Sequence, residues 1–330
     1  MIDFLQKIFI PNAEAHVRYI ADEQKLGELG GADWQYLFSP LVEGQYLLMM
    51  LATVLIAGLI FYIAYHNDRS RRYFERVRER ATSYTDLMSW LVRLPLGIGL
   101  LGFGSYGVLL SPVLETTPLL AIMQTLIGFM LLTGFLLPFA SVAVIILYFI
   151  AISQDIYMIG SLDILGLGII LLIIDSRRPG VDHLLGILDI SYKKFTKYVP
   201  TILRFCFGTG LAYLAIYEKI LNPRLSEFVV MVSDLCSVIP VSEAMWVFSA
   251  GVIELVIGLM LIIGLFTRLF AAVTFAVLSL SFFYFGEEVT SHITLFGSLA
   301  ILFVTGGGPF SLDSYIRNKP HVLTHNETEE

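Results

Sequence analysis

Long, nearly uninterrupted apolar stretches separated by short polar loops recur along most of the chain. Most of them approach the roughly 20 residues that an α-helix needs to cross the ~30 Å hydrocarbon core of a bilayer. The pattern predicts an all-α fold, a polytopic transmembrane helical bundle of about nine spans. The predicted spans cover residues 45–65, 88–110, 118–137, 139–154, 158–175, 200–221, 245–266, 269–285 and 290–305.

The composition agrees with a chain that folds in lipid. The mean hydropathy is +0.77 and only 15% of the residues are charged, which excludes a water-soluble globular protein. The net charge of −7 and the confinement of basic residues to short loops argue against a nucleic-acid partner. The first 43 residues contain no apolar segment followed by a cleavage site, so we expect no cleavable signal peptide.

The distribution of lysine and arginine predicts the orientation. Six arginines fall in the loop 67–83, whereas the loops expected on the other side carry mainly acidic residues. We therefore expect a multi-pass protein of the plasma (inner) membrane with an extracytoplasmic N-terminus and a cytoplasmic C-terminus. The predicted parts outside the repeats are an extracytoplasmic segment 1–43, an extra transmembrane helix 44–66, a basic cytoplasmic loop 67–83 and a cytoplasmic tail 314–330.

Two parts of the chain match each other without gaps. "RLPLGIGLLGFGSYGVLLSP", which starts at Arg93, aligns with "RFCFGTGLAYLAIYEKILNP", which starts at Arg204, at an offset of 111 residues. "QTLIGFMLLTGFLLP" from Gln124 aligns with "ELVIGLMLIIGLFTR" from Glu254 at an offset of 130. The matches predict two tandem four-helix units, 84–190 and 198–313, in parallel orientation.

The differences between the two copies identify candidate chemistry. Glu218, Lys219 and Glu254 stand where the first copy has Gly107, Val108 and Gln124. A lone carboxylate inside a membrane helix costs about 2.5–3.5 kcal/mol on insertion scales, so Glu254 needs a partner. Lys219 is the expected partner. Counted along the helices, its level in the membrane is closer to that of Glu254 than the level of Arg204 is. The two offsets differ by 19, so the second copy holds 19 more residues between its first two helices. These residues suit an interfacial or re-entrant segment.

The second unit resembles the DoxX family of small four-helix membrane proteins. The resemblance is carried by Arg204, by the "GTGLAYLAIYEKILNP" helix, by "GVIELVIGLMLIIGLFTR" with Glu254 and Arg268, and by "GGGPFSLD" at 306–313. It implies an antiparallel four-helix bundle, and the first unit fits as a degenerate copy. The family is similar to the membrane subunit of a thiosulfate:quinone oxidoreductase, and other members associate with redox or thiol-stress proteins.

Two interpretations of the Glu254 and Lys219 pair remain open. The pair either fixes the register of two helices or forms a polar patch that binds a polar head group or relays protons. In a quinone site, Lys219 and Tyr217 would donate hydrogen bonds to the ring carbonyls, and Glu254 would take or give the proton. Further candidate binding residues are Glu218, His292, Arg204 and Arg268; His292, together with Glu288, would connect the patch to water.

Arg204 and Arg268 have two possible roles outside a quinone site. Arg204 and Arg268 read as snorkelling interface anchors or as phosphate head-group ligands. Glycines 208, 210, 258 and 264 suit close helix packing.

No cofactor site is expected in this chain. The histidines and cysteines form no cluster with the spacing of a haem, zinc or iron–sulfur site, so we expect no metal. A quinone is expected only as a substrate, with electrons from a redox or thiol-handling partner. Two functions follow: a quinone-interacting or accessory subunit of a membrane redox complex, or a non-catalytic chaperone, assembly factor or lipid-binding receptor. A solute transporter is a more distant third, and enzyme status and oligomeric state stay open.

Overall fold

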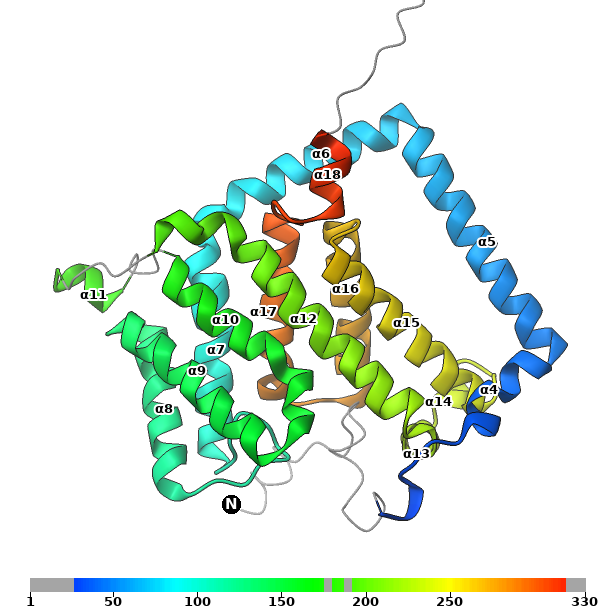
Figure 1. The fold of residues 1–330 in the computed structure, drawn as a ribbon, viewed down its shortest axis with the longest axis horizontal. Coiled ribbons are helices and arrows are strands. Elements are labelled where there is room, and N and C mark those ends of the chain that lie inside the picture. Colours follow the sequence, from blue (N-terminus) through cyan, green and yellow to red (C-terminus); the bar gives the residue numbers. More distant parts are fainter. Residues whose placement is uncertain (1–26, 175–179, 187–191, 319–330) are drawn as a thin grey trace, which may run out of the picture.

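The computed structural model describes residues 27–174, 180–186 and 192–318, and within these ranges it is built from helices with no β-strand (Figure 1). This confirms the all-α prediction. The helical elements are α4 (Trp34–Val42), α5 (Gly44–His66), α6 (Asp68–Ser83), η1 (Tyr84–Leu87), α7 (Met88–Ser105), α8 (Pro118–Thr133), α9 (Leu137–Gln154), η2 (Ile156–Ser161), α10 (Leu162–Ile173), α11 (Val181–Leu184), η3 (Lys193–Tyr198), α12 (Val199–Leu214), η4 (Ala215–Ile220), α13 (Pro223–Val232), α14 (Leu235–Val238), α15 (Glu243–Ile263), α16 (Thr267–Phe285), α17 (Val289–Thr305) and α18 (Leu312–Asn318).

Each of the nine predicted spans falls on an apolar helix of the structure. In the described part of the chain, six helical segments are long and apolar enough to cross a membrane, and the pair α4 and α5, bent by 78°, makes a seventh candidate. The remaining two, α8 and α17, are apolar but shorter. The protein is therefore a polytopic helical membrane protein whose apolar outer surface contacts lipid.

Eight of these helices fall into two groups of four that pack side by side (Figure 1). The first group is α7, α8, α9 and α10; the second group is α12, α15, α16 and α17. The helices that begin and end each group meet in the centre, because α7 packs against α17 and α10 packs against α12. One hydrophobic core runs through both groups, so they form a single body.

The helices cross closely within each group. In the second group, a Cβ added at Gly208 would lie 2.7 Å from the carbonyl oxygen of Gly258, and one at Gly258 would lie 2.8 Å from that of Gly208. No larger side chain fits at this crossing between α12 and α15. The expectation that these glycines permit close helix packing is confirmed.

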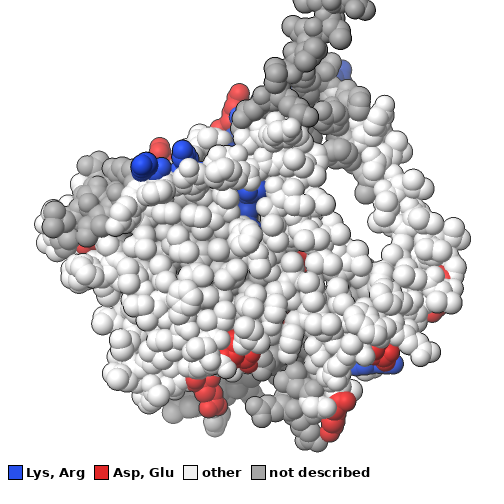
Figure 2. Space-filling model, in the orientation of Figure 1, with Lys and Arg blue, Asp and Glu red and all other residues white. Residues whose placement is uncertain are grey.

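The N-terminal elements lie beside the two groups rather than within them. α5 packs mainly against α4 and α6, and a space-filling view shows an opening between α5 and the rest of the molecule (Figure 2). The basic connection predicted over 67–83 is helical: residues 68–83 form α6, with Asn67 accepting a hydrogen bond from the N–H of Arg69 as its N-cap. Of the predicted terminal segments, residues 1–26 and 319–330 lie outside the described part.

The extra residues of the second group form a cap at one end of the bundle. They fold into α13 and α14, and α4 packs beside them against α15. Arg224 at the start of α13 lies 2.9 Å from the Asp33 carboxylate and over the ring of Tyr36, at 3.9 Å from its centroid. The charged trio described below lies next to this cap, which we call the α13 end.

At the opposite, α6 end, the two groups share one arrangement. The carboxylate of Asp182 accepts hydrogen bonds from the N–H groups of residues 136 and 137, at 2.7 and 3.0 Å. Asp313 accepts from those of residues 266 and 267, at the same two distances. Each carboxylate thus caps the N-terminus of a helix, α9 in the first group and α16 in the second.

Candidate functional site

Lys219 lies between two carboxylates. Its Nζ is 2.6 Å from Oε2 of Glu218 and 3.1 Å from Oε2 of Glu254. The predicted pairing of Lys219 with Glu254 is confirmed, and Glu218 joins it. We call these three residues the charged trio. One ammonium group faces two carboxylates, so the trio carries a net negative charge unless it holds an additional proton or binds a cationic or hydrogen-bond-donating group.

A change of helix geometry brings the trio together. Residues Ala215–Ile220 continue α12 as the π-helix η4, and turns of this kind are frequent at functional sites. The side chain of Lys219 then runs along α15 at Gly251, where an added Cβ would lie only 2.9 Å from the Cβ of Lys219. Glycine at position 251 therefore leaves the space through which Lys219 reaches Glu254.

The three members of the trio differ in exposure. The side chain of Glu218 is 0% exposed and that of Lys219 12% exposed, whereas the side chain of Glu254 is 30% exposed. Glu254 lies in the middle of α15, between half-exposed and exposed apolar residues. The inner end of the trio is thus closed by protein, and its outer end opens to the bundle surface.

A cluster of three tyrosines adjoins the inner end of the trio. The hydroxyl of Tyr157, in η2 of the first group, donates a hydrogen bond to Oε1 of Glu218. The ring of Tyr217 lies edge-on to that of Tyr157 at 5.6 Å and stacks on that of Tyr213 at 5.8 Å. The first group therefore contributes directly to a site whose charges all come from the second group. The expected Tyr217 lies at this site.

His292 lies in a buried polar cluster with the residue before Glu288. His292 is 1% exposed, and its Nε2 lies 3.0 Å from Oε2 of the buried Glu287, not of the neighbouring Glu288. Its other ring nitrogen lies 2.8 Å from the hydroxyl of Ser291. The turn after α16 directs Glu287 inward to His292, whereas Glu288 accepts a hydrogen bond from the hydroxyl of Thr290; the route to water through His292 and Glu288 stays a prediction.

In the first group, a neutral side chain takes the position of Glu254. Gln124 is fully buried; its oxygen accepts a hydrogen bond from the N–H of Leu110, and its amide nitrogen donates to the carbonyls of Leu100 and Val108. Since α7 ends at Ser105, Gln124 holds the turn that follows it. A neutral amide is therefore sufficient to fix the end of the first helix against the second.

Arg204 and Arg268 lie at the α6 end, away from the trio. Arg204 is only 1% exposed, and its Nη2 donates to the carbonyl of Phe310 at 2.7 Å. Arg268 donates to the carbonyls of Phe303 and Val304 at the C-terminus of α17. For Arg204, the prediction of a snorkelling or head-group-binding side chain is wrong, because Gly264 leaves room for the guanidinium inside the bundle.

Sequence reasoning missed several polar residues near the site. Tyr157, Asp163 and Glu287 are all buried in the structure. Asp163 is a lone acid in the apolar stretch "SLDILGLGII", a signal of the same kind as Glu254. The contacts of Tyr157 and Glu287 depend on how the two groups pack and on one turn, so the repeat alone did not point to them.

The geometry of the trio allows hydrogen bonding and proton transfer. A lysine fixed between two carboxylates donates hydrogen bonds and exchanges protons with them over distances of 2.6 and 3.1 Å. Glu254, at the exposed end, is the member that a molecule dissolved in the bilayer can reach first. The trio is therefore suited to bind the polar head of a lipid-soluble molecule and to move a proton to or from it.

Comparison with known proteins identifies the family of the second group. The DoxX family model matches residues 199–287, which run from the start of α12 to the turn before α17 and include the whole trio. No curated protein and no solved structure matches the chain. The chain is a multi-pass integral membrane protein that contains a DoxX domain at residues 199–287.

Proposed function

We propose that the DoxX domain binds a quinone at the charged trio, and that the chain is a quinone-interacting or accessory subunit of a membrane redox complex. The observation that carries the proposal is the position of Lys219 between Glu218 and the half-buried Glu254. An ammonium group beside a quinone carbonyl donates a hydrogen bond to it, and the adjacent carboxylates supply and recover the proton.

The comparison with Gln124 argues against a purely structural role for the trio. Gln124 fixes the same helix junction in the first group without any charge. Buried ion pairs are weak contributors to stability, since the desolvation of the charges offsets their attraction. A junction that a neutral amide can hold gains little from three charges, so the charges favour a role in binding or proton transfer.

The reduction of a quinone to a quinol consumes two electrons and two protons. The trio accounts for the protons. The electrons have to come from a redox partner, and we propose a thiol- or sulfur-handling protein for this role, the class that the DoxX resemblance implies. In this scheme Tyr217 and Glu218 line the head-group site together with Lys219, whereas Arg204 and Arg268 hold the opposite end of the bundle.

One observation favours a second candidate function. The opening between α5 and the two groups is wide in the space-filling view and borders apolar surface (Figure 2). An opening of this kind suits a lipid or the apolar segment of a client protein, and a non-catalytic chaperone, assembly factor or lipid-binding receptor would use the trio only to recognise a polar head group.

The same proposal includes the history and orientation of the chain. The two groups are taken as copies of one four-helix unit, of which the first has become a scaffold; the matching Asp182 and Asp313 caps support this. The α6 end is taken as cytoplasmic in a plasma (inner) membrane. Lysine and arginine side chains gather along the edge formed by α6, and acidic side chains predominate at the opposite edge, in agreement with the positive-inside rule (Figure 2).

The first experiment is native mass spectrometry with lipid and quinone extraction from the purified full-length protein. Wild type is compared with Glu254→Gln, which keeps size and hydrogen bonding but removes the charge. The matched control is Glu115→Gln, an exposed glutamate of the first group. We expect a quinone to co-purify with wild type and with the control, and to be lost from the Glu254 variant.

Other results separate the candidates. A phospholipid that is lost selectively from the Glu254 variant would replace the quinone by a lipid and favour the receptor function. Equal small-molecule content in all three proteins would reject a ligand at the trio and leave it as a helix-fixing element.

A further inference from the structure

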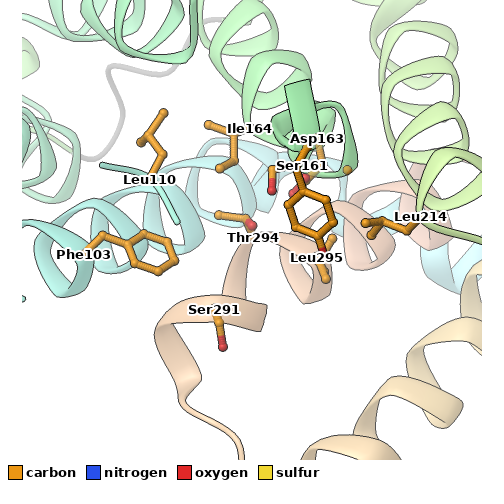
Figure 3. Close-up of a pocket in the computed structure, with 11 residues that line it drawn as sticks. Phe103, Leu110, Ser161, Asp163, Ile164, Leu214, Ser291, Thr294 and Leu295 are labelled. Carbon is orange, nitrogen blue, oxygen red and sulfur yellow. The ribbon is translucent and has the colours of Figure 1, made fainter. Parts of the chain in front are cut away.

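A second polar site lies between the two helix groups. A cavity of about 30 Å³, which has room for about one or two water molecules, lies there; it is lined by α7, η2 and α10 of the first group and by α12 and α17 of the second. Its polar lining includes Ser161, Asp163 and Thr294, which Figure 3 shows at one side of the cavity. The remaining lining is mainly apolar.

Asp163 has the most unusual environment among the residues of this cavity. It is 1% exposed, and its Oδ2 accepts no hydrogen bond from any described residue. None of the ion pairs within the described ranges includes it. An ionised carboxylate inside a membrane protein is costly unless a positive charge neutralises it. No basic side chain of the described residues pairs with this carboxyl group, so its ionised form would need another positive charge beside it.

The neighbours of Asp163 do not supply a positive charge. The titratable groups near it are Tyr148 on α9, Tyr157 on η2 and Cys206 on α12. Tyrosine and cysteine side chains are either neutral or negatively charged, so none of the three supplies a positive charge. On α17 the nearest base, His292, lies 3.0 Å from Glu287. The positive N-terminus of α10 favours the anion, since Asp163 lies in its first turn, but it does not neutralise a full charge.

We propose that this cavity is an exchangeable binding site for a small monovalent cation, either Na⁺ or a proton carried by water, with Asp163 as its charged ligand. One carboxylate balances one positive charge. The hydroxyl oxygens of Ser161 and Thr294 add the hard oxygen ligands that such an ion prefers. A divalent ion is a poor fit, because Ca²⁺ and Mg²⁺ require six or more oxygen ligands and this small site offers a single carboxylate.

The cavity is also connected to the polar groups around it. Tyr157, which lines it, donates a hydrogen bond to Glu218 of the trio. Ser291, which lines it as well, contacts His292, and His292 pairs with Glu287. A cation or proton at Asp163 therefore lies between the trio and the turn that joins α16 to α17. This site does not depend on the identity of the ligand at the trio.

The test uses infrared difference spectroscopy of the full-length protein reconstituted in lipid vesicles. Spectra of wild type, Asp163→Asn and Thr294→Val are compared between acidic and alkaline buffers, each with NaCl or with choline chloride. Asp163→Asn removes the charge at almost constant shape, and Glu115→Gln is again the control. Thermal unfolding of each variant in detergent, with either salt, reports both folding and ion binding.

Two results support the inference and distinguish the ion. A carboxylic-acid band that is gained at low pH in wild type but not in Asp163→Asn, with no effect of Na⁺, identifies a proton. A carboxylate band that shifts with Na⁺, together with a Na⁺-dependent rise in unfolding temperature that both Asp163→Asn and Thr294→Val lose, identifies Na⁺. A well-folded wild-type protein whose Asp163 signal responds neither to pH nor to Na⁺ would overturn the proposal.

Discussion

The two helix groups agree at one end of the bundle and differ at the other. At the α6 end, Asp182 and Asp313 cap helices with the same two hydrogen-bond lengths. At the α13 end, Gln124 holds a turn through backbone groups in the first group, whereas in the second group Glu254 meets Lys219 across an extended helix. The conserved geometry carries the fold, and the divergent geometry carries the candidate chemistry.

The difference shows which structural elements accompany the charged trio in the second group. Both groups have the same carboxylate caps at the α6 end, and the second group has in addition a π-helix, a glycine opposite the lysine and the α13–α14 cap. Gly251 illustrates the change, because the first group has Ala121 at the same place, where no lysine passes. The π-helix and Gly251 bring Lys219 to Glu254, and the α13–α14 cap covers the neighbouring end of the bundle.

Among the substitutions that distinguish the two groups, Lys219→Met should destabilise the protein most. It leaves two carboxylates without their cation, and removing one partner of a buried ion pair costs about 3–5 kcal/mol. We expect a large drop in unfolding temperature in detergent. Adding Glu218→Gln and Glu254→Gln to the Lys219 variant should recover most of the loss. A triple variant as unstable as the single one would contradict the role of uncompensated charge.

Gln124→Leu tests the neutral junction of the first group. The substitution leaves the N–H of Leu110 and the carbonyls of Leu100 and Val108 without their partner, which costs about 1–3 kcal/mol for buried groups. We expect lower stability but an unchanged ligand at the trio, measured by thermal unfolding and native mass spectrometry. Loss of the ligand in this variant would show that the two groups are not chemically separate.

Gly251→Ala tests whether the side chain of Lys219 passes close to α15. The new methyl group would lie 2.9 Å from the Cβ of Lys219, so we expect a net loss of about 1 kcal/mol and weaker ligand binding. The matched exchange is Ala121→Gly, which should cost about 0.5–1 kcal/mol through backbone entropy alone and leave binding intact. Equal ligand retention in both variants would argue against a close passage of Lys219.

The smallest effect is expected at the cap, which only the second group has. The N–H of Tyr36 and the nearby Arg224 hold the pKa of Asp33 below its usual value of 3.8. The ionised carboxylate therefore stabilises the cap at pH above 3.8, and this contribution is lost as the pH falls through the folded pKa. Asp33→Asn should flatten the acid side of the stability profile, followed by thermal unfolding against pH; an unchanged profile would exclude Asp33 as its source.

Much of the fold was readable from the sequence because membrane helices leave a strong pattern. Each predicted span corresponds to an apolar helix, since lipid requires long apolar runs whose backbone groups bond internally. The pairing of Glu254 with Lys219 was also predictable, because the aligned positions of the first group, Gln124 and Val108, carry neither charge and a buried charge needs a partner.

The remaining parts depend on tertiary packing that one sequence does not reveal. Arg204 looked like an interface residue, but a glycine at position 264 with a left-handed backbone conformation opens space for it inside the bundle. Tyr157 reaches Glu218 only because η2 of the first group packs against α12 of the second. The basic segment 67–83 looked like a loop, since its helical form is visible only in the structure.

The contact between the two groups has a consequence for stoichiometry. Because α7 packs on α17 and α10 on α12, the two groups share one core and are not independent subunits. Within the described part of the chain, Lys219 with its two carboxylates belongs to the second group, and the first group has the neutral Gln124 where the second has Glu254. A ligand bound at the trio should therefore saturate at one equivalent per chain, with no cooperativity between the two groups.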